Sequence, residues 1–498
     1  MNPDLAFSPA PLSYVAALRG IKSRQPGERF TYGEVMFSNP DRIVCLAASN
    51  PEGNFYGLAL REEDKMEGEA EAKARQVGNV TFLTGKLSEF LAKTENKTGA
   101  IPPLNYFCCD ERQANLMAPE HTALFSLAEK LLLPGGLFGY RYRAYEKEDG
   151  ALCFLVRELA PEMNAEQAMG FLQELKNLGV FYFRNHLEAS EKLDQAITSG
   201  VPDKFFADYE GTYARSGSFD TIVALRPRGF VYAGDADIRL NYIDLAAPAN
   251  AHQIVVDCRN NHLYESVKDF TLNRQERCDI WVHCPVTQTA NLPELFGNFV
   301  YGITIPKEDV PKQVKTEGKQ IDLSAPLFIK LIDLMTLMPV GIGDFLAHPN
   351  GKNFSAADVV NAIQTLVACG IARPMRGHYK STTRADIAQP RLVGSFNRYL
   401  DKTAIDGNKI WLASPVAGSA MEVSARDALV MQALNRAGLA NAASVLLPEL
   451  QRLAKDPVSA ASILHAVAPT SETATQMIKD SVMESAVQWY AYGLLAAA

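Results

Sequence analysis

Several acidic and aromatic residues lie in or just beyond candidate strands, where they could contact a bound ligand. Five of them are Tyr32, Glu34, Glu62, Asp110 and Tyr142. In an open α/β sheet, ligands bind beyond the carboxyl ends of the strands. Asp110, which directly follows the predicted strand at 104–109, is therefore a candidate for binding or chemistry on position alone.

The elements around these residues alternate between strand and helix over residues 29–142. The first unit combines a strand at 30–37, a short helix at 42–49 and a second strand at 54–60. Three further strands are predicted, at 80–83, 104–109 and 137–142. This alternation indicates the α/β class, with a doubly wound sheet.

The composition is that of an ordinary globular protein. The 498 residues are 47% hydrophobic and 21% charged, with a net charge of −8. The negative charge argues against non-specific binding to nucleic acid or to an anionic membrane as a main role. No apolar run is long enough to span a bilayer, no secretory signal is recognisable, and eight scattered cysteines do not indicate a disulfide framework. We therefore expect a cytoplasmic protein without membrane insertion.

Several stretches resemble bacterial S-adenosylmethionine-dependent methyltransferases of the class I fold that carry a methyltransferase regulatory domain. Around the first helix, Tyr32, Glu34 and residues 46–51 and 55–57 match the family motif. Further matching stretches are residues 229–235, 267–281 and 412–419. The matches are spread over roughly residues 29–460.

The resemblance implies four regions. They are a Rossmann-like methyltransferase domain at 1–160, a helical connector at 161–204, the regulatory domain at 205–310 and a helical, winged-helix-like region at 311–498. It also implies S-adenosylmethionine as the cofactor and a protein substrate or partner, with lysine as the default methyl acceptor. Self-association is an open alternative.

On the same resemblance, six residues are placed at the cofactor: Tyr32, Glu34, Phe37, Ser38, Glu62 and Asp110. Asp110 and Tyr142 are the candidates for facing the methyl acceptor, and both are weak candidates for catalysis. Glu62 would stand in for the acid with which the family binds the ribose hydroxyls, and Glu63 could do the same.

The loops that would carry the chemistry depart from the family motif. Met36 and Phe37 are bulky where the family has glycines that let backbone N–H groups approach the ligand, and Pro40 removes one such donor. Ala59 stands where the family has its ribose-binding acid. The aromatic group expected after the fourth strand is absent.

Two hypotheses follow from these departures. In the first, the chain is a methyltransferase homologue that is catalytically impaired and acts as a regulatory or binding partner. In the second, it is an active methyltransferase with a re-built cofactor site. The two hypotheses differ in what occupies the cleft beyond Phe37 and Ala59.

Charged residues in the second half of the chain are expected to have a structural role more than a catalytic one. Asp269, Arg274 and Arg277 could form a buried ion-pair cluster between domains, with gating of the cofactor cleft as the alternative. Four potential ligands lack the paired spacing of a zinc site, so no metal is expected; they are His262, Cys278, His283 and Cys284.

The C-terminal region is expected to be mostly helical, beginning after a polar linker at 306–324. Helices are predicted at 327–337, 356–369, 424–437 and 441–454. A predicted wing carries five basic residues, Arg373, Arg376, His378, Lys380 and Arg384. On an acidic protein such residues are expected to be solvated, and nucleic-acid binding is not expected.

A variant that restores the family residues tests whether only the cofactor loop has changed. We expect the combined changes Phe37→Gly, Asn39→Gly and Ala59→Asp to create or improve binding of S-adenosylmethionine, measured by calorimetry, because they supply a close-approaching backbone and a ribose acid. An unchanged affinity would mean that the cleft is closed for other reasons.

Overall fold

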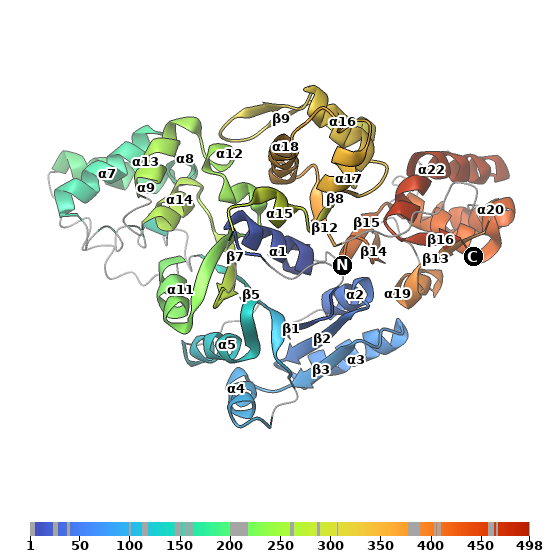
Figure 1. Ribbon diagram of the computed structural model, residues 1–498, viewed down its shortest axis with the longest axis horizontal. Coiled ribbons are helices and arrows are strands. Elements are labelled where there is room, and N and C mark those ends of the chain that lie inside the picture. Colours follow the sequence, from blue (N-terminus) through green and yellow to red (C-terminus); the bar gives the residue numbers. More distant parts are fainter. Residues whose placement is uncertain are drawn as a thin grey trace.

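We describe the protein from a computed structural model (Figure 1). It describes most of the chain, in the ranges 5–22, 28–36, 40–98, 101–111, 118–144, 151–152, 155, 159, 163–199, 218–258, 263–285, 289–305, 307–376, 389–402, 405, 410–456, 463–464 and 467–497. The expected site residues Phe37 and Ser38 lie outside these ranges.

A seven-stranded sheet forms the centre of the fold, with strand order β3-β2-β1-β4-β5-β7-β6. The strands are β1 (Phe30–Met36), β2 (Gly53–Ala59), β3 (Val80–Thr84), β4 (Leu104–Asp110), β5 (Leu132–Arg143), β6 (Phe230–Asp235) and β7 (Glu276–His283). The first five strands are parallel, and β7 is antiparallel to both of its neighbours. The expected doubly wound α/β sheet is therefore confirmed.

The sheet is completed by strands from the expected regulatory domain. β7 pairs with β5 from Leu137–Val282 to Arg143–Glu276, and β6 lies on its outer side. Because β7 is antiparallel, its first residues lie at the same edge as the carboxyl ends of β1, β4 and β5. The expected boundary near residue 160 thus separates two segments that share one sheet.

The helices of the first half agree closely with the sequence pattern. They are α2 (Asp41–Ser49), α3 (Glu62–Ala74), α4 (Leu87–Glu95) and α5 (Ala118–Leu131). Although α3 is highly charged, Gly68 and Ala72 give it a narrow buried face, and the ring of Phe82 packs against Gly68. The small residues on α3 therefore let a surface helix approach the sheet.

A second core joins the connector helices to helices of the regulatory segment. The helices are α7 (Ala165–Asn177), α8 (Phe181–Asn185), α9 (Leu187–Ser199), α13 (His252–Asp257) and α14 (Tyr264–Thr271). Tyr182 stacks on Phe270 with ring centroids 4.2 Å apart, and Leu172 and Leu193 are buried in the same cluster. These helices form the group at one end of the molecule in Figure 1.

The helix α1 (Pro9–Leu18) lies at the centre of the molecule (Figure 1). It contacts β6 and β7 of the sheet and also β12 (Arg373–Met375) and α15 (Leu292–Phe296) of the next region. Tyr14 is fully buried, and its ring contacts those of Phe296 and Phe299. The helix is therefore buried between the sheet and the next region.

The next region has the expected winged-helix-like order of elements. After α15 and β8 (Val300–Gly302) come α16 (Pro326–Met335), β11 (Val340–Gly341), α17 (Ile342–Ala347), α18 (Ala356–Ala368) and β12. β8 pairs with both β11 and β12 in a small antiparallel sheet. We refer to residues 289–376 as the winged module.

The expectation of a linker at 306–324 was wrong. Within this stretch, β9 (Gln313–Lys315) and β10 (Gln320–Asp322) form an antiparallel hairpin. Leu323 is buried, and Val314 and Ile321 pack against the core of the winged module. The alternating apolar residues of a polar stretch therefore bury one face of a hairpin.

The last region, residues 389–497 as described, combines helices with small antiparallel pairs. Its elements are β13 (Pro390–Leu392), α19 (Gly394–Arg398), β14 (Ile410–Ser414), β15 (Ser419–Val423), α20 (Ala425–Leu453), α22 (Ser471–Ala491) and β16 (Leu495–Ala497). Gly438 has φ 69° and ψ 171°, which breaks α20 into the two helices expected from the sequence. The helix α22, which packs on α20, was missed.

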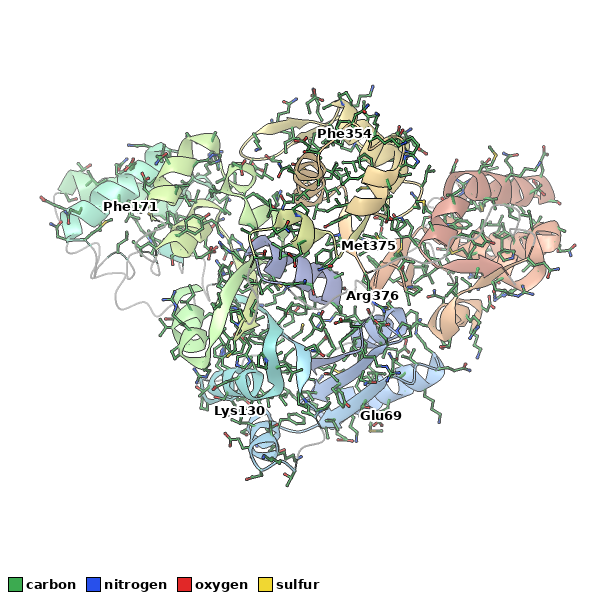
Figure 2. The ribbon with its side chains drawn as sticks, viewed as in Figure 1. Glu69, Lys130, Phe171, Phe354, Met375 and Arg376 are labelled. Atoms are coloured by element: carbon green, nitrogen blue, oxygen red, sulfur yellow. The ribbon has the colours of Figure 1, made fainter. Side chains whose placement is uncertain are left out.

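This last region, together with the end of the winged module, docks on the helices that follow β1 and β2. The Asn50 amide donates to the Gly418 carbonyl at 2.9 Å, and the Arg75 guanidinium lies 4.2 Å from the centre of the Phe396 ring. Arg376, which lies next to Met375 in Figure 2, forms an ion pair with Glu52. The C-terminal half therefore contacts the sheet domain directly.

A glycine at the contact between β2 and Phe82 provides a test of this packing. A Cβ at Gly57 would lie 2.5 Å from the Met36 sulfur and 2.7 Å from the Phe82 ring. We expect Gly57→Ala to lower the free energy of unfolding by about 1–3 kcal/mol in urea denaturation, because the ring must move. The control is Gly170→Ala, which meets open space on α7 and should stabilise the helix by about 0.5–1 kcal/mol. Equal effects of the two changes would contradict this account.

Candidate functional site

The carboxyl edge of the sheet begins with Glu34, which is buried and bonded within the chain. Its carboxylate accepts a hydrogen bond from the Tyr32 hydroxyl at 2.9 Å and one from the Arg42 Nε at 2.9 Å. Burial alone would lower the pKa of Arg42, but the charge of Glu34 outweighs it and raises that pKa. Glu34 and Arg42 therefore form a tightly paired, charged unit at the end of β1.

A second acid and a second arginine adjoin this pair. Asp110 ends β4, and its Oδ2 lies 4.0 Å from Nη1 of Arg42 and 3.4 Å from Nη1 of Arg141. The ring of Phe7 is fully buried, with the two guanidinium carbons 5.2 and 5.3 Å from its centre. We refer to Glu34, Arg42, Asp110 and Arg141 as the Glu34 cluster. Two carboxylates, two guanidinium groups and an aromatic cover leave it internally compensated.

The end of β2 lacks the acid that a ribose would require. Ala59 is fully buried, paired in the sheet with Met36 and Thr84. Glu62 opens α3 with its side chain half-exposed, and its carboxylate lies 3.0 Å from the Lys65 ammonium group. A pair this exposed contributes little to stability. Glu62 is therefore near the expected position but held by its own helix.

The side chain of Met36 points into the core, where its sulfur packs over Gly57 beside Phe82. Its bulk therefore does not fill the space beyond the strand. Two described residues of the cofactor motif nevertheless differ from what the family motif would offer a ligand. The Glu34 carboxylate is already bonded by Tyr32 and Arg42, and Ala59 offers no acceptor for the ribose.

A group of buried charges lies where β7 begins. The Arg277 side chain is 0% exposed and contacts the carboxylates of Asp269, Asp279 and Glu265, the last two at 2.9 and 3.0 Å. Arg274 pairs with Asp235 at 2.7 Å and with Asp269 at 3.4 Å. We refer to these residues as the Arg277 cluster. The expected ion-pair cluster is therefore present, and it joins β6, β7 and α14.

The charges within the Arg277 cluster influence one another strongly. Burial alone would raise the pKa of Glu265, but Lys268 and Arg277 hold it at about 2. Burial raises the pKa of Asp279 to about 6 in spite of the nearby Arg277. The cluster thus depends on Arg277 to keep its buried carboxylates ionised.

Tyr142, a candidate for the acceptor side, belongs to this structural cluster. It is fully buried, and its hydroxyl donates to Asp279 Oδ2 at 2.7 Å. Burial raises its pKa well above the ordinary value for tyrosine. A phenol in this position is a hydrogen-bond donor to the cluster.

A small cavity of about 270 Å³ lies between α5 and α11 (Ser218–Leu225), beside the ends of β4 and β5. His121 and Tyr140 line it. The Tyr140 hydroxyl donates to Glu111, whose Oε2 is 3.6 Å from the His121 ring nitrogen. An acid, a phenol and an imidazole therefore meet here, and none of them was a sequence candidate.

The expected basic wing shows no exposed basic face where it is described. Arg376 is paired with Glu52, and Arg373 has two buried guanidinium nitrogens. The other three basic residues lie outside the described ranges. His283 is one of the four residues for which no metal site was expected. Its ring nitrogen lies 3.0 Å from the Leu132 carbonyl oxygen, at hydrogen-bond distance.

Sequence reasoning missed the two arginines and the ring that complete the Glu34 cluster. Arg141 had a signal, since a charged residue within the apolar strand Phe138–Tyr142 needs a partner. Arg42 sits in the first turn of a short amphipathic helix, where an arginine is usually solvated. Phe7 offered no signal, because its neighbours are far away in the sequence.

The fold is similar to that of PKMT2 from Rickettsia typhi over almost the whole of both chains. The identity is 13%, the TM-score is 0.65, and the similarity covers 99% of each chain. For the same protein in complex with AdoHcy, the identity is 13%, the TM-score is 0.64 and the coverage is 99% of this chain and 98% of that chain. At this identity the similarity establishes the fold. No curated protein matches the sequence.

Residues 213–283 match a family described as a predicted methyltransferase regulatory domain. The described part of this segment contains α11, β6, α14 and β7, and it therefore holds most of the Arg277 cluster. The expectation of a class I methyltransferase fold with a methyltransferase regulatory domain is confirmed.

Removing the central guanidinium tests the structural role of the Arg277 cluster. We expect Arg277→Met to lower the free energy of unfolding by about 3–5 kcal/mol in urea denaturation, since Asp269 and Asp279 would lose their counter-charge. The control is Arg239→Met, a half-exposed arginine paired with Asp237 at 3.6 Å, which should change stability by less than about 0.5 kcal/mol. A loss below about 1 kcal/mol for Arg277→Met would show that the carboxylates find other partners.

Proposed function

We propose that this class I methyltransferase fold with a regulatory domain is a catalytically impaired homologue of S-adenosylmethionine-dependent methyltransferases. Its function is then to bind or regulate another protein. The observation that supports the proposal most strongly is the pairing of Glu34, the acid retained from the cofactor motif, with Arg42 and Tyr32. A carboxylate that is satisfied within the chain is a poor partner for a ligand.

The end of β2 supports the same proposal independently. Methyl transfer depends mainly on holding the cofactor and acceptor in a reactive geometry. With Ala59 buried in place of an acid, and Glu62 bonded to Lys65 on the surface, the described residues provide no preformed contact for the ribose. Loss of one such contact would weaken binding, and loss of both ends of the site would weaken it more.

A role in binding protein is supported by what the fold retains. The sheet, the Arg277 cluster and the winged module are all intact, although residues of the cofactor motif have changed. We propose a protein as the partner and a reducing, cytoplasmic location. Seven cysteines in the described chain are free thiols, and five of them are buried. None of the described helices is long and apolar enough to cross a membrane.

The alternative is an active methyltransferase with a re-built site, using S-adenosylmethionine. One observation favours it: Glu62 lies directly beyond β2, and its exposed pair with Lys65 is weak enough to be exchanged for a ligand. In this case Glu34 and Asp110 would remain at the cofactor, and a protein lysine would be the acceptor to test first.

Calorimetric titration with S-adenosylmethionine and S-adenosylhomocysteine distinguishes the two. We expect the wild-type chain to give no binding heat and no thermal shift at millimolar cofactor. Glu34 at the end of β1 is already bonded within the chain, and Ala59 at the end of β2 has no acceptor for the ribose. PKMT2, whose complex with AdoHcy is known, is the positive control.

Saturable binding at micromolar cofactor would overturn the proposal in favour of the alternative. In that event Glu62→Gln should weaken binding, whereas Glu67→Gln, at an exposed position on the same helix, should not. Equal affinities for both variants would then remove Glu62 from the site.

A further inference from the structure

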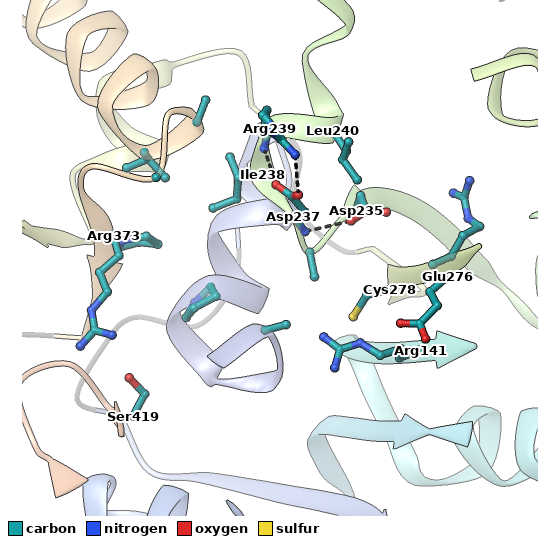
Figure 3. A pocket seen from close by; sticks show the side chains of 18 of the residues that line it. Arg141, Asp235, Asp237, Ile238, Arg239, Leu240, Glu276, Cys278, Arg373 and Ser419 are labelled. Carbon is teal, nitrogen blue, oxygen red and sulfur yellow. Dashed lines mark hydrogen bonds and ion pairs between the residues drawn. The ribbon is translucent and has the colours of Figure 1, made fainter. Parts of the chain in front are cut away.

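A cavity of about 650 Å³ lies where three parts of the chain meet (Figure 3). One wall is the carboxyl edge of the sheet, with Arg141, Asp235 and Cys278. A second wall is the end of α18 and β12 in the winged module, including Arg373, and a third contains Ser419 of the β14–β15 hairpin. Its volume is in the range of small-molecule sites.

The cavity is lined by more arginines than acids. The arginines are Arg141, Arg239, Arg274, Arg277 and Arg373, and the acids are Asp235, Asp237 and Glu276. Four of the arginines have counter-charges: Arg141 pairs with Asp110, Arg239 with Asp237, and Arg274 and Arg277 belong to the Arg277 cluster. The remaining arginine is Arg373.

Arg373 has no counter-charge in the part of the chain that the structure describes. Its Nε and Nη2 are buried without a hydrogen-bond partner. The titratable group beside it is Tyr492, a phenol whose hydroxyl donates to the Ile303 carbonyl. Burial lowers the pKa of Arg373, as expected for a cation that has lost water without gaining an anion.

Burying a guanidinium without a counter-charge costs folding free energy. An apolar side chain would fill the same position without that cost. Figure 3 shows the Arg373 side chain extending along the cavity toward Ser419. The Ser419 side chain is buried, and its hydroxyl forms a long hydrogen bond, of 3.5 Å, to the Ala420 carbonyl, with no other partner among the described residues. Arg373 and Ser419 thus both line one end of the cavity, and Nε and Nη2 of Arg373 are covered by the surrounding chain.

We propose that this cavity binds a small molecule bearing a carboxylate or phosphate group, which pairs with Arg373. The planar guanidinium can donate two parallel hydrogen bonds to either oxyanion. The unpaired guanidinium of Arg373 disfavours a cationic ligand, such as a lysine side chain, at this end of the cavity. The proposal goes beyond the proposed function and does not depend on it, because Arg373 lies outside the Glu34 cluster.

The position of the cavity gives such a ligand a consequence for the whole molecule. Its walls come from the sheet, the winged module and the last region, so a ligand would contact all three at once. Binding would therefore stabilise the arrangement of these parts relative to one another.

The test compares thermal unfolding of the full chain in sodium phosphate, sodium succinate and sodium chloride at equal ionic strength. We expect a saturable rise in Tm with phosphate or with succinate above that with chloride, and the better of the two identifies the oxyanion. Arg373→Met should weaken this binding at least about tenfold. Arg398→Met, at an exposed position on α19, should leave it unchanged.

The same variants distinguish binding at Arg373 from general salt effects on stability, because a general salt effect persists when Arg373 is replaced. Without added oxyanion, Arg373→Met should be at least as stable as the wild type, since it removes an unpaired buried charge. If Arg373→Met does not fold, two other measurements test the proposal. They are oxyanion binding by Arg373→Lys and the hydrogen exchange of Arg373–Met375 in the wild type. Ligand should slow that exchange.

Three results would overturn the proposal. They are the absence of a saturable effect of either oxyanion in the wild type, retention of the full effect in Arg373→Met, and unchanged exchange of β12 at saturating oxyanion.

Discussion

The burial of Arg277 is the constraint on which the arrangement of the sheet and regulatory segment depends. A guanidinium that is 0% exposed must be surrounded by acceptors, and these come from α14, from β7 itself and from Tyr232 of β6. Tyr142 of β5 reaches the same group through Asp279. Because an unpaired member would be costly, β5, β6, β7 and α14 can only come together in one register. The charged cluster thus fixes how the regulatory segment meets the sheet.

The Glu34 cluster also consists of buried ion pairs, at the other half of the sheet edge, but its consequence concerns ligand binding. Where a ligand-binding acid would be left available, Glu34 is bonded to Arg42 and Tyr32, and Phe7 covers the arginines. Both clusters are nearly self-sufficient. Arg373 differs from them, since two of its guanidinium nitrogens are buried in a wall of a cavity and no described acid pairs with it. The two clusters therefore stabilise the fold, whereas the charge of Arg373 remains available to a ligand.

Local signals were sufficient for much of the fold. The helices α2 and α18 were predicted within about one residue at each end, and α20 was predicted as two helices, which meet at Gly438. The α/β class and the doubly wound sheet followed from the alternation of elements and from the resemblance. The ion pairs of Asp269, Arg274 and Arg277 were also anticipated.

The site was less predictable, because its contacts join residues that are distant in sequence. Tyr142 stood at a strand end, which suggested a ligand, but its partner Asp279 lies 137 positions away. Arg42 looked like a surface residue until β1 placed Glu34 against it. The hairpin at 313–322 was read as a linker because its apolar residues are few, although they all lie on one face.

The central position of α1 has a consequence for how the chain acquires its structure during synthesis. This helix leaves the ribosome early and can contact β5 soon afterwards, but most of its contacts are with β6, β7, α15 and β12, which extend to residue 375. At ordinary elongation rates the helix waits on the order of tens of seconds for the last of them. Throughout this time Tyr14 lacks the rings of Phe296, Phe299 and Tyr301 that it contacts in the folded protein. The nascent chain therefore presents an apolar helix to the cell's chaperones long before its core can close.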